Sequence, residues 1–162
     1  MTPSEYEIVV ADIVSGICNG AANLGGLKLG SGRSNRLEGR SGYKHQIDVS
    51  LSSGTALYLI ECKRWDDKIG IEEVMVLAAR DTDISQLHPS ANIKAILVSK
   101  TGATRGAKML ASHFGIDLEI VSSPREFGLR IGRHISLGVA DSTALRDDAS
   151  CEVVRNGVIV NE

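Results

Sequence analysis

The stretch HQIDVSLSSGTALYLIECKRW, residues 45–65, predicts two β-strands joined by a tight turn. HQIDVSL alternates apolar with polar residues, which places Asp48 on the face of the strand opposite to Ile47 and Val49. LYLIECKRW is a short apolar run typical of a buried strand, and the intervening SSGT is typical of a hairpin turn. The rest of the chain can be interpreted as support for this strand pair.

Antiparallel pairing of the two strands brings Asp48 beside Glu61, and Lys63 lies two residues further along on the same face. Two carboxylates and an ammonium at the end of an apolar sheet are costly to bury without a compensating ion or ligand. Carboxylate oxygens suit Mg²⁺ or Mn²⁺. A Glu-x-Lys tripeptide by itself is usually an ordinary surface pair, and the flanking apolar strands and the preceding Asp48 are what favour a metal site here.

Asp48 followed by Glu61-Cys62-Lys63 resembles the PD-(D/E)xK nuclease signature, with Ile47 in the variable proline position. GRSGYKHQIDVSL and LYLIECKRW resemble the matching segments of the Mrr-type branch of restriction-endonuclease-like nucleases. The resemblance implies an α/β fold with an αβββαβ core, whose mixed central sheet is flanked by helices. It also implies Asp48 and Glu61 as metal ligands, helped by the Cys62 backbone carbonyl, and Lys63 as a catalytic group.

A first helix is predicted from Ser4 to about Cys18, with Ser4 as N-cap and apolar residues at helical spacing. Glu7 stands three residues after Ser4 and has two interpretations. It can complete a capping box, or, as the resemblance implies, it can complete the acidic metal cluster.

Four basic residues precede the Asp48 strand in a glycine-rich stretch, and only Glu38 opposes them: Arg33, Arg36, Arg40 and Lys44. They form either a solvated loop or an edge that contacts nucleic-acid phosphates, and we favour the second. Some further polar residues lie near the predicted site without an assigned role: His45, Asp66, Asp67 and Gln86.

The second half of the chain predicts alternating helices and strands. A helix is expected after residue 70, and strand, helix and strand follow over residues 92–123 as a βαβ unit with parallel pairing. PREFGLRIGRHI predicts a short helix, and CEVVRNGVIVNE predicts a β-hairpin. We expect a nuclease core at residues 1–124, and we expect residues 125–162 to be a C-terminal extension of the same domain.

Composition sets limits on function. The chain has 162 residues, 43% hydrophobic and 23% charged, as expected for one globular domain. The three cysteines show no CxxC spacing and the four histidines show no HExxH pair, which argues against zinc sites. No apolar stretch reaches membrane length and no basic leader is present, so we expect a cytoplasmic protein.

The hypothesis is a Mg²⁺- or Mn²⁺-dependent endonuclease that hydrolyses DNA, in restriction or defence against foreign DNA. DNA is the expected partner, and a homodimer or a partner subunit is expected because a lone domain of this size reads little sequence. A junction-resolving or repair nuclease of the same fold is the alternative within the class. A non-catalytic DNA-binding or assembly module is the alternative from another class, and a nucleotide-binding protein is disfavoured because no Walker spacing is present.

Overall fold

The computed structural model describes residues 3–20, 27–63, 67–121, 123–140, 151–155 and 158–160, and it describes side chains within residues 8–20, 27–63, 67–121 and 123–132. Its elements in chain order are α1 Pro3–Gly20, β1 Leu27–Ser31, β2 Arg36–Glu38, β3 Lys44–Gln46, β4 Val49–Ser53, β5 Ala56–Cys62, α2 Ile71–Leu87, β6 Asn92–Ser99, α3 Arg105–Phe114, β7 Asp117–Ile120, α4 Pro124–Ala140, β8 Cys151–Arg155 and β9 Val158–Val160.

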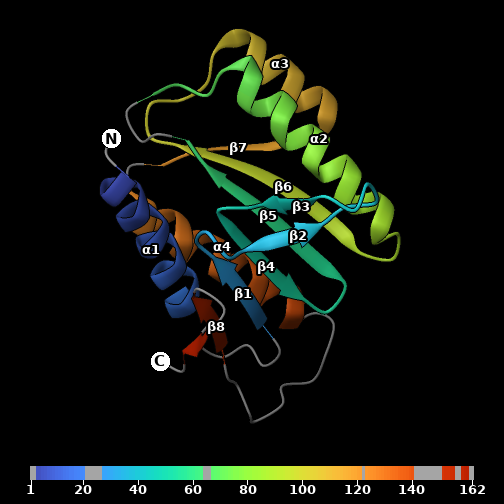
Figure 1. The fold of residues 1–162 in the computed structure, drawn as a ribbon. Helices are drawn as coiled ribbons and strands as arrows, with labels where there is room; N and C mark the ends of the chain where they lie inside the picture. Colours follow the sequence, from blue (N-terminus) through green and yellow to red (C-terminus); the bar gives the residue numbers. More distant parts are fainter. Residues whose placement is uncertain are drawn as a thin grey trace.

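A mixed sheet forms the centre of the molecule, with strand order β7-β6-β5-β4-β1-β8-β9 (Figure 1). β4 pairs antiparallel with both β1 and β5, while β5, β6 and β7 are parallel. The parallel connections run through α2 and α3, because parallel neighbours need a crossover. The succession α1, β1, β4, β5, α2 and β6 is the expected αβββαβ core, and β2 and β3 form a separate hairpin inserted within it.

Helices cover both faces of the sheet, each over its own apolar core (Figure 1). α1 and α4 lie on one face, where Ile13 and Phe127 pack with Val49 and Ile60. α2 and α3 lie on the other face, where side chains such as Leu77 pack with the strand residues that point to that face. Ile60 faces the core under α1. Glu61, the next residue of β5, therefore faces α2, because successive residues of a strand point to opposite faces.

The chain from residue 45 to residue 53 is not one strand as the alternation predicts. β3 ends at Gln46 and β4 begins at Val49, and β3 pairs with β2 rather than within the main sheet. Ile47 packs into the core under α2, whereas Val49 packs into the core under α1. The two apolar side chains thus satisfy different cores, and the backbone bends between them at Asp48.

The C-terminal stretch also differs from the prediction, because the short helix expected at residues 124–135 is the 17-residue α4. α4 packs closely on α1 through glycines, and a Cβ added at Gly128 would lie 2.3 Å from the Ile13 carbonyl oxygen. β8 pairs parallel with β1, and β9 pairs antiparallel with β8.

Candidate active site

Two carboxylates meet where β4 begins and β5 ends. Asp48 is only 8% exposed, and its Oδ2 accepts a hydrogen bond of 2.8 Å from the Cys62 backbone amide. Burial, and next the charge of the adjacent Asp48, raise the pKa of Glu61 from 4.5 to about 8, against the opposing effect of Arg80. The free protein therefore holds a proton at this pair near neutral pH, because two adjacent buried carboxylates resist simultaneous ionisation.

Helix α2 supplies the counter-charge for Glu61. Arg80 Nη1 lies 2.5 Å from Glu61 Oε1, and both side chains are largely shielded from solvent. The guanidinium reaches across from α2 to the end of β5, so it partly offsets the negative charge of the carboxylate pair. A site that already attracts one cationic group is also electrostatically suited to a metal ion.

Lys63 is held by the same helix. Its backbone amide donates to the Val98 carbonyl at 2.9 Å, which continues the pairing of β5 with β6 by one residue. Its Nζ forms an ion pair with Glu73, whose Oε2 also accepts from the Gly70 backbone amide at 2.8 Å. Partial burial would raise the pKa of Glu73, but the hydrogen bonds from Lys63 and Gly70 outweigh it and lower the pKa. Glu73 thus stays ionised and holds the Lys63 ammonium at the first turn of α2.

The side chain of Cys62 points away from this site, into the core under α1. Burial, and then the charges of Asp48 and Glu61, raise the pKa of its thiol. Only its backbone is available to the site, as the resemblance to the nuclease signature implies. Glu7 lies in α1, but its side chain is outside the described residues, as is Asp66.

The basic residues predicted to bind nucleic acid lie on and before the β2–β3 hairpin, and all four side chains are exposed. Arg36 and Lys44 share the outward face of the hairpin, since Arg36 pairs with Gln46 and Lys44 pairs with Glu38. Arg40 belongs to the loop at the hairpin tip, and Arg33 lies in the turn before β2. The structure therefore gathers three of the four cations on one small hairpin, which leads directly into Asp48.

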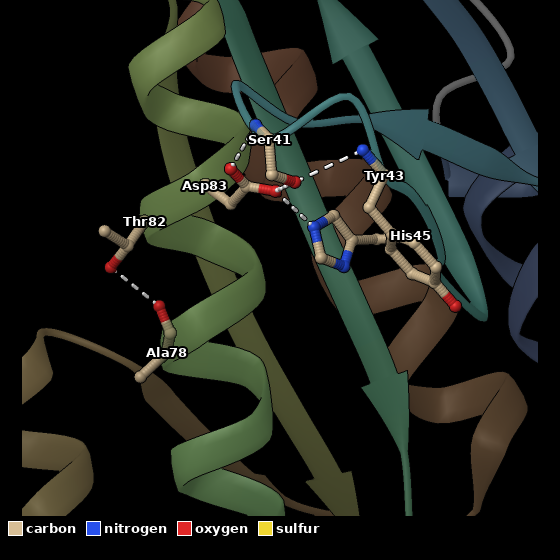
Figure 2. Close-up of polar contacts among 6 residues, drawn as sticks. All are labelled: Ser41, Tyr43, His45, Ala78, Thr82 and Asp83. Atoms are coloured by element: carbon tan, nitrogen blue, oxygen red, sulfur yellow. Dashed lines mark hydrogen bonds and ion pairs between the residues drawn. The ribbon is translucent and has the colours of Figure 1, made fainter.

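His45 lies on the inward face of the same hairpin, where Asp83 of α2 holds it (Figure 2). Its Nε2 lies 2.7 Å from Asp83 Oδ2, and the Ser41 hydroxyl donates to the same oxygen at 2.6 Å. The Ser41 amide donates to Asp83 Oδ1 at 2.8 Å, and the Arg40 amide donates to the Asp83 carbonyl at 2.9 Å. His45 is therefore an anchoring residue of the hairpin rather than part of the carboxylate site.

The remaining neighbours named from the sequence take no part in the carboxylate site. Asp67 is exposed, and its backbone carbonyl accepts a hydrogen bond of 3.1 Å from Ser99. Gln86 is exposed at the end of α2. A hollow lined by residues of β1, of β4 and of the turn before β2, including Lys28, Ser50 and Asn35, does not include the carboxylate pair.

Sequence reasoning missed three residues of α2 that contact the site or the hairpin, namely Glu73, Arg80 and Asp83. Glu73 carries a local signal, since it stands at the third position of the helix and caps it. Arg80 lies seven residues later, hence on the same helix face. Nothing local marks Asp83, because its partners are far away in the sequence.

The donor set fits a hard divalent cation. Within the part of the chain whose side chains are described, no three His, Cys, Asp or Glu side chains cluster as metal ligands. Asp48 and Glu61 do supply two adjacent carboxylates, and Mg²⁺ commonly takes one or two from the protein and completes its shell with water. A bound cation would favour the ionised form of Glu61, whose pKa is raised by burial and by the charge of Asp48.

The core order and the position of Asp48 and Glu61-Cys62-Lys63 define the restriction-endonuclease-like class of PD-(D/E)xK proteins. The family model Mrr_cat, described as a restriction endonuclease, matches residues 27–125. The chain belongs to this family and has the restriction-endonuclease-like fold. A search of curated proteins finds no significant match.

Solved structures are similar to this chain at low sequence identity. The crystal structure of AF1548, a protein of unknown function, is 20% identical, has a TM-score of 0.51 and covers 74% of this chain. A repair endonuclease from Pyrococcus abyssi is 21% identical, with a TM-score of 0.43 over 55% of this chain. The match spans 66% of the first structure and 38% of the second.

Across the helices that the structure describes, none combines the length and the apolar character needed to cross a membrane.

Proposed function

We propose that this protein is a metal-dependent deoxyribonuclease that cleaves DNA in restriction or defence against foreign DNA. The observation that carries the proposal is the adjacent pair Asp48 and Glu61, with Lys63 two residues after Glu61 in the sequence, in a chain of the Mrr_cat family. We place the nuclease core at residues 1–124 and regard residues 125–162 as an extension of it, and we expect the protein to act in the cytoplasm.

In this proposal Mg²⁺ or Mn²⁺ is held by Asp48 and Glu61, with the Cys62 backbone carbonyl and Glu7 as further ligands. When bound, the ion would supply the positive charge that polarises the scissile phosphate and stabilises the leaving oxygen. Asp48 is already oriented for this role by its hydrogen bond from the Cys62 amide. Arg80 keeps the Glu61 carboxylate in a fixed position at the end of β5.

Lys63 performs the remaining chemistry of an in-line hydrolysis. The Lys63 side chain orients the attacking water and offsets the charge of the phosphate as the ammonium, or helps to remove the proton of that water as the neutral amine. Glu73 restricts the movement of Lys63, so the lysine is placed before substrate arrives. Arg36, Arg40 and Lys44, together with Arg33, contact DNA phosphates on the approach to Asp48. A second copy of the chain or a partner subunit extends this small DNA-contacting surface.

The test is cleavage of supercoiled plasmid DNA with Mg²⁺, Mn²⁺ or EDTA by the wild type, Lys63→Ala and Lys94→Ala. Lys94 is a matched control, because it also forms an ion pair, with Asp117, but lies at the exposed start of β6. Lys63→Ala should lower the cleavage rate by about 100-fold or more while DNA binding in EDTA is retained. Lys94→Ala should cleave like the wild type.

Two results would contradict the proposal. If the wild type binds DNA but cleaves neither plasmid nor a four-way junction with either ion, the protein is a binding module. If Lys63→Ala cleaves as fast as the wild type, the catalytic site lies elsewhere.

A further inference from the structure

The tip of the β2–β3 hairpin carries an exposed aromatic ring. Tyr43 is 65% exposed, more than any other aromatic side chain described as exposed; Phe114, at 40%, is the next. Exposing a large ring to water gains nothing for folding, so such a ring on a charged surface points to a binding role.

The ring is held in place rather than free to move. It packs edge-on against the His45 imidazole at a centroid distance of 5.0 Å, and Figure 2 shows the two rings side by side. The Tyr43 amide donates to the Ser41 hydroxyl at 3.2 Å, and Asp83 fixes both His45 and Ser41. A fixed ring loses little conformational freedom when it binds a ligand, which favours a preformed contact.

Two basic residues lie close to Tyr43 in the chain, at the tip of the hairpin. Lys44 follows Tyr43 directly, Arg40 lies three residues before it, and both side chains are exposed. An exposed aromatic ring beside cations is the arrangement with which proteins bind unpaired nucleotides, since the ring stacks on a base and the cations contact the backbone. A fully stacked duplex offers no free base face to such a ring.

We propose that Tyr43 stacks on an unpaired or extruded base of the DNA substrate, which makes the hairpin tip a sensor of locally unpaired DNA. This inference rests on the proposed nuclease function and adds the structural feature that the site recognises. Asp48 follows Tyr43 by five residues, so their Cα atoms are at most about 18 Å apart. At 3.4 Å for each nucleotide along a strand, the cut should fall within about five nucleotides of the stacked base.

The test measures binding, in EDTA, to a short duplex with one unpaired base and to the same duplex fully paired. Tyr43→Ala should lose about 5- to 100-fold in affinity for the unpaired-base duplex and less than about twofold for the paired one. Tyr43→Phe keeps the ring and should bind like the wild type. Phe114→Ala is the matched control, because Phe114 makes the same kind of edge-on contact with His113, also at 5.0 Å, on α3.

A fluorescent adenine analogue at the unpaired position gives a second measurement that tests stacking itself. Its emission should be quenched by the wild type and by Tyr43→Phe, but not by Tyr43→Ala. If Tyr43→Ala weakens both duplexes equally, or weakens neither, while the wild type still cleaves DNA, the stacking inference is wrong and the nuclease proposal stands. If the wild type binds neither duplex and cleaves no DNA, the nuclease proposal fails as well.

Discussion

Replacing Glu61 with glutamine should remove a large pH dependence of stability. The pKa of Glu61 is raised from 4.5 to about 8 in the folded protein, so folding favours its protonated form. The resulting stabilisation is complete below pH 4.5, and it is lost as the pH rises through 8. At 1.36 kcal/mol for each pH unit, the wild type should lose about 5 kcal/mol of unfolding free energy across this range.

The assay is urea unfolding at a series of pH values with EDTA present. Glu61→Gln should lack most of this loss, because glutamine stays neutral throughout. Glu119→Gln should follow the wild type, since Glu119 on β7 forms a more exposed ion pair with Arg130 of α4. Parallel pH profiles for the wild type and Glu61→Gln would refute the claim that burial and Asp48 together hold a proton on Glu61.

Two further predictions concern packing and the hairpin anchor. Gly128→Ala should destabilise the protein by about 1–3 kcal/mol, because the added Cβ would lie 2.3 Å from the Ile13 carbonyl oxygen. Urea unfolding measures this loss, and an unchanged urea midpoint would show that α1 and α4 can separate freely. Hydrogen bonds from Ser41, and next from His45, lower the pKa of Asp83 from 3.8 to about 2. The stability that ionised Asp83 gives to the folded protein is therefore present above pH 3.8 and is lost as the pH falls to 2. Asp83→Asn should therefore unfold at lower urea than the wild type near neutral pH, and the gap should close between pH 4 and 2; a constant gap would contradict this.

The sequence predicts the two strands around Gly54 well because both signals are local. Alternation marks the strands, and Gly54 takes the left-handed conformation of the turn, with φ of 58°. The predicted proximity of Asp48 and Glu61 follows from the pairing of Val49 with Ile60. Local alternation cannot reveal the bend at Asp48, since Ile47 and Val49 are equally apolar and only the folded protein assigns them to different cores.

The contribution of α2 to the site is the part that the sequence hides. The helix itself is predicted correctly from its apolar spacing. Which of its polar residues reaches Glu61 depends on how the helix lies across the sheet, and that is a tertiary property. Arg80 and Asp83 are ordinary helix-surface residues by sequence, and they acquire roles only through Glu61 and His45.

The most direct test of the account is plasmid cleavage by Asp48→Asn beside the wild type, with DNA binding measured in EDTA. The substitution keeps the shape of the side chain and removes the charge that a divalent cation requires. The account predicts that the wild type cleaves with Mg²⁺ or Mn²⁺ and not with EDTA, while Asp48→Asn binds DNA and leaves it intact. Equal cleavage by Asp48→Asn and the wild type, or wild-type cleavage that persists in EDTA, would contradict it.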